Sequence, residues 1–143
     1  MSMYGQFSTN ATVEQRGIIL DYDAFQVRIA RAGGANEKYS KALETKTRPH
    51  RRALQLGSLP ESLATKMLHE VYAETVVLGW QTKNDKGVLV DGIEGPKGDI
   101  LPVTQENLIA TFKALPDLFA DIQLQSNNAA MFREQLLEDD SKN

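Results

Sequence analysis

The chain has 143 residues, of which 41% are hydrophobic and none is cysteine, and its formal net charge is -3 at pH 7. This length predicts one domain with its own core, and the lack of cysteine excludes disulfide bonds and thiolate zinc sites. The acidic balance argues against a protein that binds duplex nucleic acid, because such domains are usually basic. There is no signal-peptide pattern, and no apolar run approaches the roughly 20 residues that span a bilayer. We therefore expect a soluble, cytoplasmic protein without membrane contact.

The first part of the chain predicts a loose segment followed by paired strands. Residues 1–12 are mostly polar or small and predict a flexible N-terminus before a single domain over residues 13–137. Two β-branched runs follow, Ile18 to Tyr22 and Phe25 to Ala30. Apolar and polar residues alternate in the second run, as in a half-buried strand. This spacing predicts a β-hairpin.

A helix is predicted after the second strand. Gly33 and Gly34 end the strand, and Asn36 stands where it could cap a helix from Glu37 to about Lys46. A glycine pair before a helix can hold a phosphate, but the spacing and the Lys-Ser/Thr ending of a phosphate loop are missing. A plain connection is therefore favoured. Pro49 then starts or kinks a further helix.

The densest basic cluster of the chain surrounds Pro49, and its members are Arg48, His50, Arg51 and Arg52. An arginine side chain can bond a carboxylate in two places. The cluster therefore predicts contact with an acidic partner, and solvated charges on a turn are the alternative.

Residues 58–80 predict the long helix against which the rest of the chain packs. Ser58 and Glu61 have the spacing of a capping box, and two adjacent apolar rows recur at helical spacing. Gly79 stands where a C-cap is expected, and His69 falls on the polar face, where it should be solvated.

The remainder predicts a loop, two helices and a tail. Residues 81–103 are rich in glycine and predict a long loop with room for a small hairpin around Val88 to Val90. Thr104 should cap one helix and Pro116 should start the next. Residues 138–143 predict an acidic, flexible C-terminus. Overall we expect an α+β fold, mainly α, with an N-terminal β-hairpin packed on a bundle of about four to five helices.

No catalytic constellation is recognisable. His50 and His69 are the two histidines, and the second histidine of a zinc-protease motif starting at His69 would fall on Ala73. Glu70 and Glu74 are spaced like an exposed pair rather than an acid catalyst. We therefore expect no enzyme, no metal and no cofactor, and a small enzyme with a site on the predicted loop is a minor alternative.

Three segments resemble the tail assembly chaperones of long-tailed bacteriophages. They are FQVRIARAGGANEKYSKALETKTRPHRRAL, the helix ending EVYAETVVLGW, and ILPVTQENLIATFKALPDLFADI. The matching phrases fall at Ile29 to Gly33, Asn36 to Tyr39, Arg48 to Arg52, Trp80, Pro102 to Asn107 and Leu115 to Phe119. The resemblance covers about residues 18–122.

This resemblance implies a protein that binds and solubilises the tape measure protein and helps to recruit the major tail protein during tail tube assembly. It implies a homo-oligomer in the host cell cytoplasm that is absent from the mature virion. It also implies a longer form made by programmed frameshifting. Lys142 and Asn143 permit an adenine-rich slippery sequence, so we expect this chain to be the short form.

Self-association and partner binding are expected to use the basic cluster. Its acidic counterpart would be a stretch of the tape measure protein or the tail of another copy, at Glu138, Asp139 and Asp140. The alternative is a small nucleic-acid-binding module that uses Arg48 to Arg52, whose affinity should fall steeply with salt.

Overall fold

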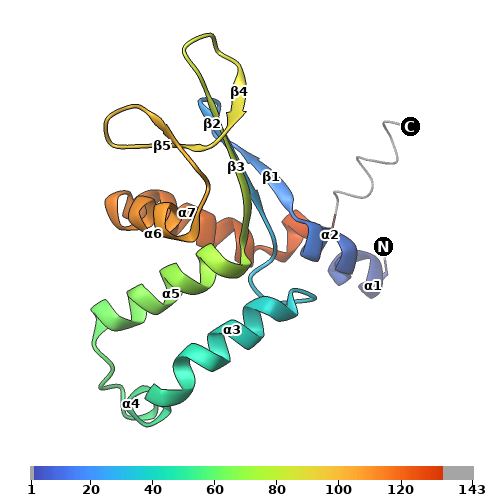
Figure 1. The fold of residues 1–143 in the computed structure, drawn as a ribbon. Helices are drawn as coiled ribbons and strands as arrows, with labels where there is room; N and C mark the ends of the chain where they lie inside the picture. The colour runs from blue at the N-terminus through green and yellow to red at the C-terminus, as the bar shows by residue number, and fades with distance from the viewer. Residues whose placement is uncertain (1, 134–143) are drawn as a thin grey trace.

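The computed structural model describes residues 2–133 and places an antiparallel sheet beside several helices (Figure 1). Helices α3 and α5 lie side by side and extend away from the sheet, and α4 joins them at the far end (Figure 1). Among the described residues, no helix is long and apolar enough to cross a membrane.

The main sheet has the order β1-β2-β3-β4, with every neighbouring pair antiparallel. Its strands are β1 (Ile18–Asp21), β2 (Phe25–Ile29), β3 (Val77–Lys83) and β4 (Leu89–Asp91). Side chains alternate between faces, so Val27 and Ile29 are fully buried while Arg28 between them is exposed. A two-stranded ribbon of β5 (Ile93–Glu94) and β6 (Ile100–Leu101) follows. One face of the main sheet therefore borders the core.

The helices complete the fold, and two short 3-10 helices, η1 and η2, lie among them. They are α1 (Met3–Phe7), α2 (Ala11–Arg16), α3 (Glu37–Thr47), η1 (Arg48–His50), α4 (Arg51–Leu56), α5 (Glu61–Thr75), α6 (Gln105–Ala114), α7 (Pro116–Asn127) and η2 (Ala129–Phe132).

The core lies between the sheet and helices α5, α6 and α7. Its largest members include Val27, Ile29, Tyr72, Val76, Trp80, Phe112, Phe119, Ile122 and Phe132. Aromatic side chains meet edge-on here, as Tyr72 does with Phe119 at a centroid distance of 5.2 Å. Tyr39 of α3 packs edge-on against Tyr72 and joins α3 to this core.

The predicted architecture of an N-terminal hairpin on a helical bundle is wrong. Strands β1 and β2 pair, but they form half of a four-stranded sheet, and α1 and α2 precede them. The second half comes from β3 and β4. Of β3, residues 77–80 were predicted as the end of a helix and residues 81–83 as loop, and residues 89–91 were predicted as loop with room for a small hairpin. Residues 1–12, expected to be loose, contain α1 and the start of α2. The content is still that of an α+β fold.

The long central helix is shorter than predicted. It runs from Glu61 to Thr75, and β3 begins after Val76. Val77, Trp80 and Thr82 are buried in β3, where the pairing with β2 uses them. The predicted capping box is absent from the described contacts, because the Ser58 hydroxyl instead donates to the Ala53 carbonyl at 3.4 Å.

Other local predictions are confirmed. The Thr104 hydroxyl accepts from the Asn107 amide at 3.1 Å and caps α6, and α7 begins at Pro116. The hairpin expected near Val88 to Val90 exists as the β3–β4 pair, and part of the predicted 81–103 loop lies in strands β3 to β6.

Candidate partner-binding surface

The predicted basic cluster lies on a helical projection that we call the arm, comprising α3, η1, α4 and α5. Within the described chain, no residue of α3, η1 or α4 is buried. Apart from Tyr39, which packs against the core, these elements contribute little to the core of their own domain. Helices in proteins gain most of their stability from tertiary packing, so such an arm is a candidate surface for a partner.

The four predicted cluster residues meet at the end of the arm. Arg48 pairs with Glu44 at 3.1 Å, and both side chains are 62% exposed, so this pair contributes little to stability. His50 ends η1 and is half-buried, whereas Arg51 and Arg52 are exposed. The two arginines begin α4, which continues directly from η1, and neither has an ion-pair partner among the described residues. Both charges are therefore available to an acidic partner.

Two leucines lie beside these arginines, and the sequence analysis missed them. Leu54 is 46% exposed and Leu56 is 70% exposed. On a helix, residues three and four apart are neighbours, so Leu54 adjoins Arg51 and Leu56 adjoins Arg52. We call these four residues the arm tip. Leu54 and Leu56 are two residues apart and lie on different sides of α4, so each leucine sits beside one arginine rather than beside the other leucine. Each side offers apolar contact next to a positive charge, which is chemistry that suits an amphipathic helix with acidic flanks.

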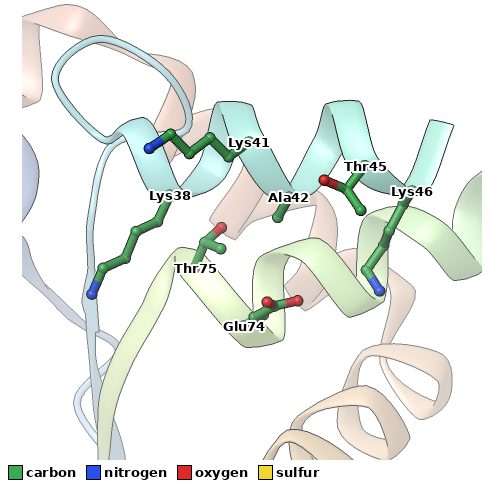
Figure 2. A pocket seen from close by; sticks show the side chains of 7 residues that line it. All are labelled: Lys38, Lys41, Ala42, Thr45, Lys46, Glu74 and Thr75. Carbon is green, nitrogen blue, oxygen red and sulfur yellow. The ribbon is translucent and has the colours of Figure 1, made fainter. Parts of the chain in front are cut away.

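A groove runs along the arm between α3 and α5 (Figure 2). It has a volume of about 480 Å³, and its lining residues are Lys38, Lys41, Ala42, Thr45, Lys46, Glu74 and Thr75. The lysines come from α3, while Glu74 and Thr75 come from α5 (Figure 2). Lys46 also bonds Glu70 at 3.2 Å. The positive side of the groove extends the basic character of the arm tip towards the sheet.

Buried polar residues fix the base of the arm. The Asn36 side chain donates to the carbonyls of Arg31 and Thr75 at 2.9 and 3.0 Å. It thus joins the start of α3 to the end of α5 instead of capping α3 as predicted. Glu14 is buried and forms an ion pair with Arg31. Four segments of the chain therefore meet at one polar junction, which orients the arm on the domain.

His69 is buried, and its predicted solvation is wrong. It is 5% exposed and meets Phe119 edge-on at a centroid distance of 4.5 Å. Phe112 of α6 and Phe119 of α7 cover His69. Other residues of the predicted polar face, such as Lys66 and Glu74, stay exposed. Burial, with the charge of Lys113 as a second cause, lowers the pKa of His69. Its Nδ1 atom has no hydrogen-bond partner among the described residues. The lowered pKa favours the neutral imidazole at this buried position.

The remaining predicted site residues, Glu138, Asp139 and Asp140, lie outside the described residues. Their pairing with the basic cluster stays a prediction. In the part of the chain that the structure describes, no group of three or more His, Asp or Glu residues could hold a metal ion.

A comparison with protein families finds a match, and the matched residues include the arm. A family model described as YdaY prophage protein matches residues 34–143. The match begins after β2 and includes the whole arm, β3 and the helices that cover the core. No curated protein and no solved structure matches the chain.

Proposed function

The chain belongs to the YdaY prophage protein family, and from this premise we propose that it is a phage tail assembly chaperone. In this role it binds and solubilises the tape measure protein and helps to recruit the major tail protein, without catalysis or a cofactor. The family gives the phage context, and the chaperone role rests on the sequence resemblance together with the form of the arm.

The observation that carries the proposal is the exposed arm tip. Leu54 and Leu56 are apolar, largely exposed and placed on a helix that buries none of its described residues. A long helical partner with apolar faces needs such surfaces to cover it until it assembles. Arg51 and Arg52 would select partner segments that carry acidic residues beside the apolar face.

Reversible binding suits this role. Burying roughly 600 Å² of apolar surface per copy, counted over both partners and beyond the two leucines, would contribute on the order of 15 kcal/mol before costs. The ordering of two molecules and of their side chains offsets most of that gain. Many copies on one tape measure protein would each bind weakly, so the major tail protein could displace them in sequence.

The proposal includes further partners and a place of action. The chain would self-associate, work beside a longer frameshifted form of itself, and act in the host cell cytoplasm without entering the mature virion. Membranes and nucleic acids are not partners in this proposal.

Co-expression with the tape measure and major tail proteins of the same phage or prophage tests the function. We expect the tape measure protein to become soluble and to co-purify with the chaperone. The double variant Leu54→Ser/Leu56→Ser should lose most of this effect. Leu124→Ser is the matched control, because Leu124 is 65% exposed on α7 and lies outside the arm.

Two outcomes would contradict the proposal. A tape measure protein that stays insoluble and unbound beside the unaltered chaperone would exclude the function. Equal losses in the arm-tip variant and the Leu124 variant would exclude the arm tip as the binding surface while leaving the function in place.

A further inference from the structure

The short helix α1 exposes an apolar face. Its side chains of Met3, Tyr4 and Phe7 are 66%, 75% and 68% exposed, and helical spacing puts them on one side. The Ser2 hydroxyl caps the helix by accepting from the Gly5 amide at 3.0 Å. The segment MYGQF carries no charged residue. Within the chain, the Arg133 guanidinium lies 5.7 Å from the centroid of the Phe7 ring and covers part of this face. A helix this short is not stable in water without tertiary contacts, so the part of its apolar face that stays exposed calls for a partner.

An apolar groove lies at another part of the same molecule, between α6 and the β5–β6 ribbon. It has a volume of about 320 Å³, and its lining includes Pro96, Leu101, Ala110, Ala114 and Leu115. Leu115 is 53% exposed at its edge. Small residues on α6 leave room above the helix, and this groove could take one or two large apolar side chains.

The helix α1 cannot enter the groove of its own chain. The Asn10 amide donates to the Phe132 carbonyl at 3.2 Å, which holds the start of α2 beside η2. Only Ser8 and Thr9 separate Phe7 from Asn10, and the extended link spans about 10 Å. Helix α1 and the ribbon lie at opposite ends of the molecule (Figure 1). An intermolecular contact is the arrangement that brings the two apolar surfaces together.

We propose that α1 of one copy docks in the groove between α6 and the β5–β6 ribbon of a second copy. The two surfaces match in chemistry, since the segment of α1 itself carries no charged residue and the groove lining is apolar apart from Glu94, Asn107 and Thr111. They differ from each other, so the contact is head-to-tail and generates a ring or an open chain. A five-residue helix buries little area, so association is weak and depends on concentration.

This proposal deepens the proposed self-association and does not require a tape measure partner. The apolar contact also differs from an ion-pair contact of the basic cluster in its salt dependence. At about 1 M salt the Debye length is only about 3 Å, so ion pairs are screened and the α1 contact persists.

Complementation between two variants of the full chain tests the arrangement at about 1 M salt. The head variant is Tyr4→Ser/Phe7→Ser. The groove variant is Ala110→Glu/Ala114→Lys, which fills the groove and keeps a favourable helical pair. Sedimentation velocity should show that the unaltered chain grows with concentration and that each variant alone is monomeric. A mixture should give a heterodimer and nothing larger. The head variant retains an intact groove and the groove variant retains an intact α1, so the mixture can form one contact.

A labelled peptide of residues 2–9 gives a second measurement that does not depend on assembly. Its fluorescence anisotropy should rise with the unaltered chain and with the head variant, and stay low with the groove variant. The same peptide with Phe7→Ser should not bind, and the full-chain Leu124→Ser variant should behave as the unaltered chain. Circular dichroism confirms that each variant is folded.

Any of three results overturns the proposal. These are an unaltered chain that is monomeric at every concentration, a mixture of the variants that stays monomeric, and a peptide that binds the groove variant as well as the unaltered chain. Because none of these measurements contains the tape measure protein, their failure is distinct from failure of the chaperone function.

Discussion

At the scale of single residues, buried polar groups decide how the arm sits on the domain. Asn36 is 5% exposed and supplies the donors for two backbone carbonyls from different segments. One of these carbonyls belongs to Thr75 at the end of α5, and the other to Arg31 after β2. Without a donor, a buried carbonyl loses a partner that water cannot replace. The arm thus depends on one amide side chain.

Replacing Asn36 tests this dependence. We expect Asn36→Ala to lower the free energy of unfolding by about 1–3 kcal/mol, since both carbonyls lose their donor. Asn36→Asp keeps the shape but removes the donors, so its loss should be at least as large. Urea denaturation measures both. A change within about 0.5 kcal/mol for the alanine variant would show that the junction is not structural.

His69 gives a second prediction, concerning pH. Its pKa is lower in the folded chain than the ordinary value of about 6.5, so the unfolded chain binds the proton more readily. The stability that this group contributes is complete above pH 6.5 and is lost as the pH falls below it. The loss is at most about 1.4 kcal/mol per pH unit.

Urea denaturation between pH 7.5 and about pH 5 should show this loss in the unaltered chain and a shallower pH dependence in His69→Gln. His50→Gln is the control, because His50 is the other histidine of the chain and lies at the end of η1, outside the aromatic cluster that surrounds His69. Parallel pH profiles for the unaltered chain and His69→Gln would refute the assignment.

At the scale of elements, a substitution at Gly79 can distinguish the observed strand from the predicted helix end. A C-cap glycine has a positive φ, but the φ of Gly79 lies outside that region, and an added Cβ would approach only Arg28 Cβ, at 3.8 Å. Gly79→Ala should therefore leave stability unchanged or raise it by about 0.4–1 kcal/mol.

The matched control for this substitution is Gly17→Ala. Gly17 has a φ of 88°, and an added Cβ would lie 2.6 Å from the Ile29 carbonyl oxygen, so the alanine should destabilise the chain. Thermal unfolding compares the two variants. A clear loss of stability for Gly79→Ala would favour the helical end over the strand.

Local signals were sufficient for some elements and not for others. The caps at Thr104 and Pro116 depend on nearest neighbours, and both were predicted from sequence. Residues 77–83 fit helical and strand periods alike, and their strand pairs with β2 about fifty residues earlier. Burial of His69 depends on α6 and α7, which follow much later in the chain. Such non-local contacts leave no local pattern.

At the scale of the whole molecule, the candidate site combines one predicted and one unpredicted part. The basic cluster was visible as a run of charges at Arg48 to Arg52. Leu54 and Leu56 resemble ordinary core positions of a helix, and their exposure became visible only once α4 was placed at the end of the arm. Sequence alone therefore indicated the charge of the surface and missed its apolar half.

Charge reversal tests the electrostatic part of this surface. Arg48→Glu/Arg51→Glu/Arg52→Glu should weaken both tape measure binding and low-salt association between copies. The substitutions remove attraction to acidic groups and add repulsion. Sedimentation velocity at low salt and at about 1 M salt separates this effect from the α1 contact. Association unchanged at low salt would refute the role of the cluster.

A single buried residue, Val76, links α5 to β3, so the arm continues into the sheet without a flexible joint. The sheet therefore sets the direction in which the arm leaves the domain. Copies joined head-to-tail would then present their tips at a regular interval. On a long helical partner, the number of bound copies would then be proportional to the length of that partner.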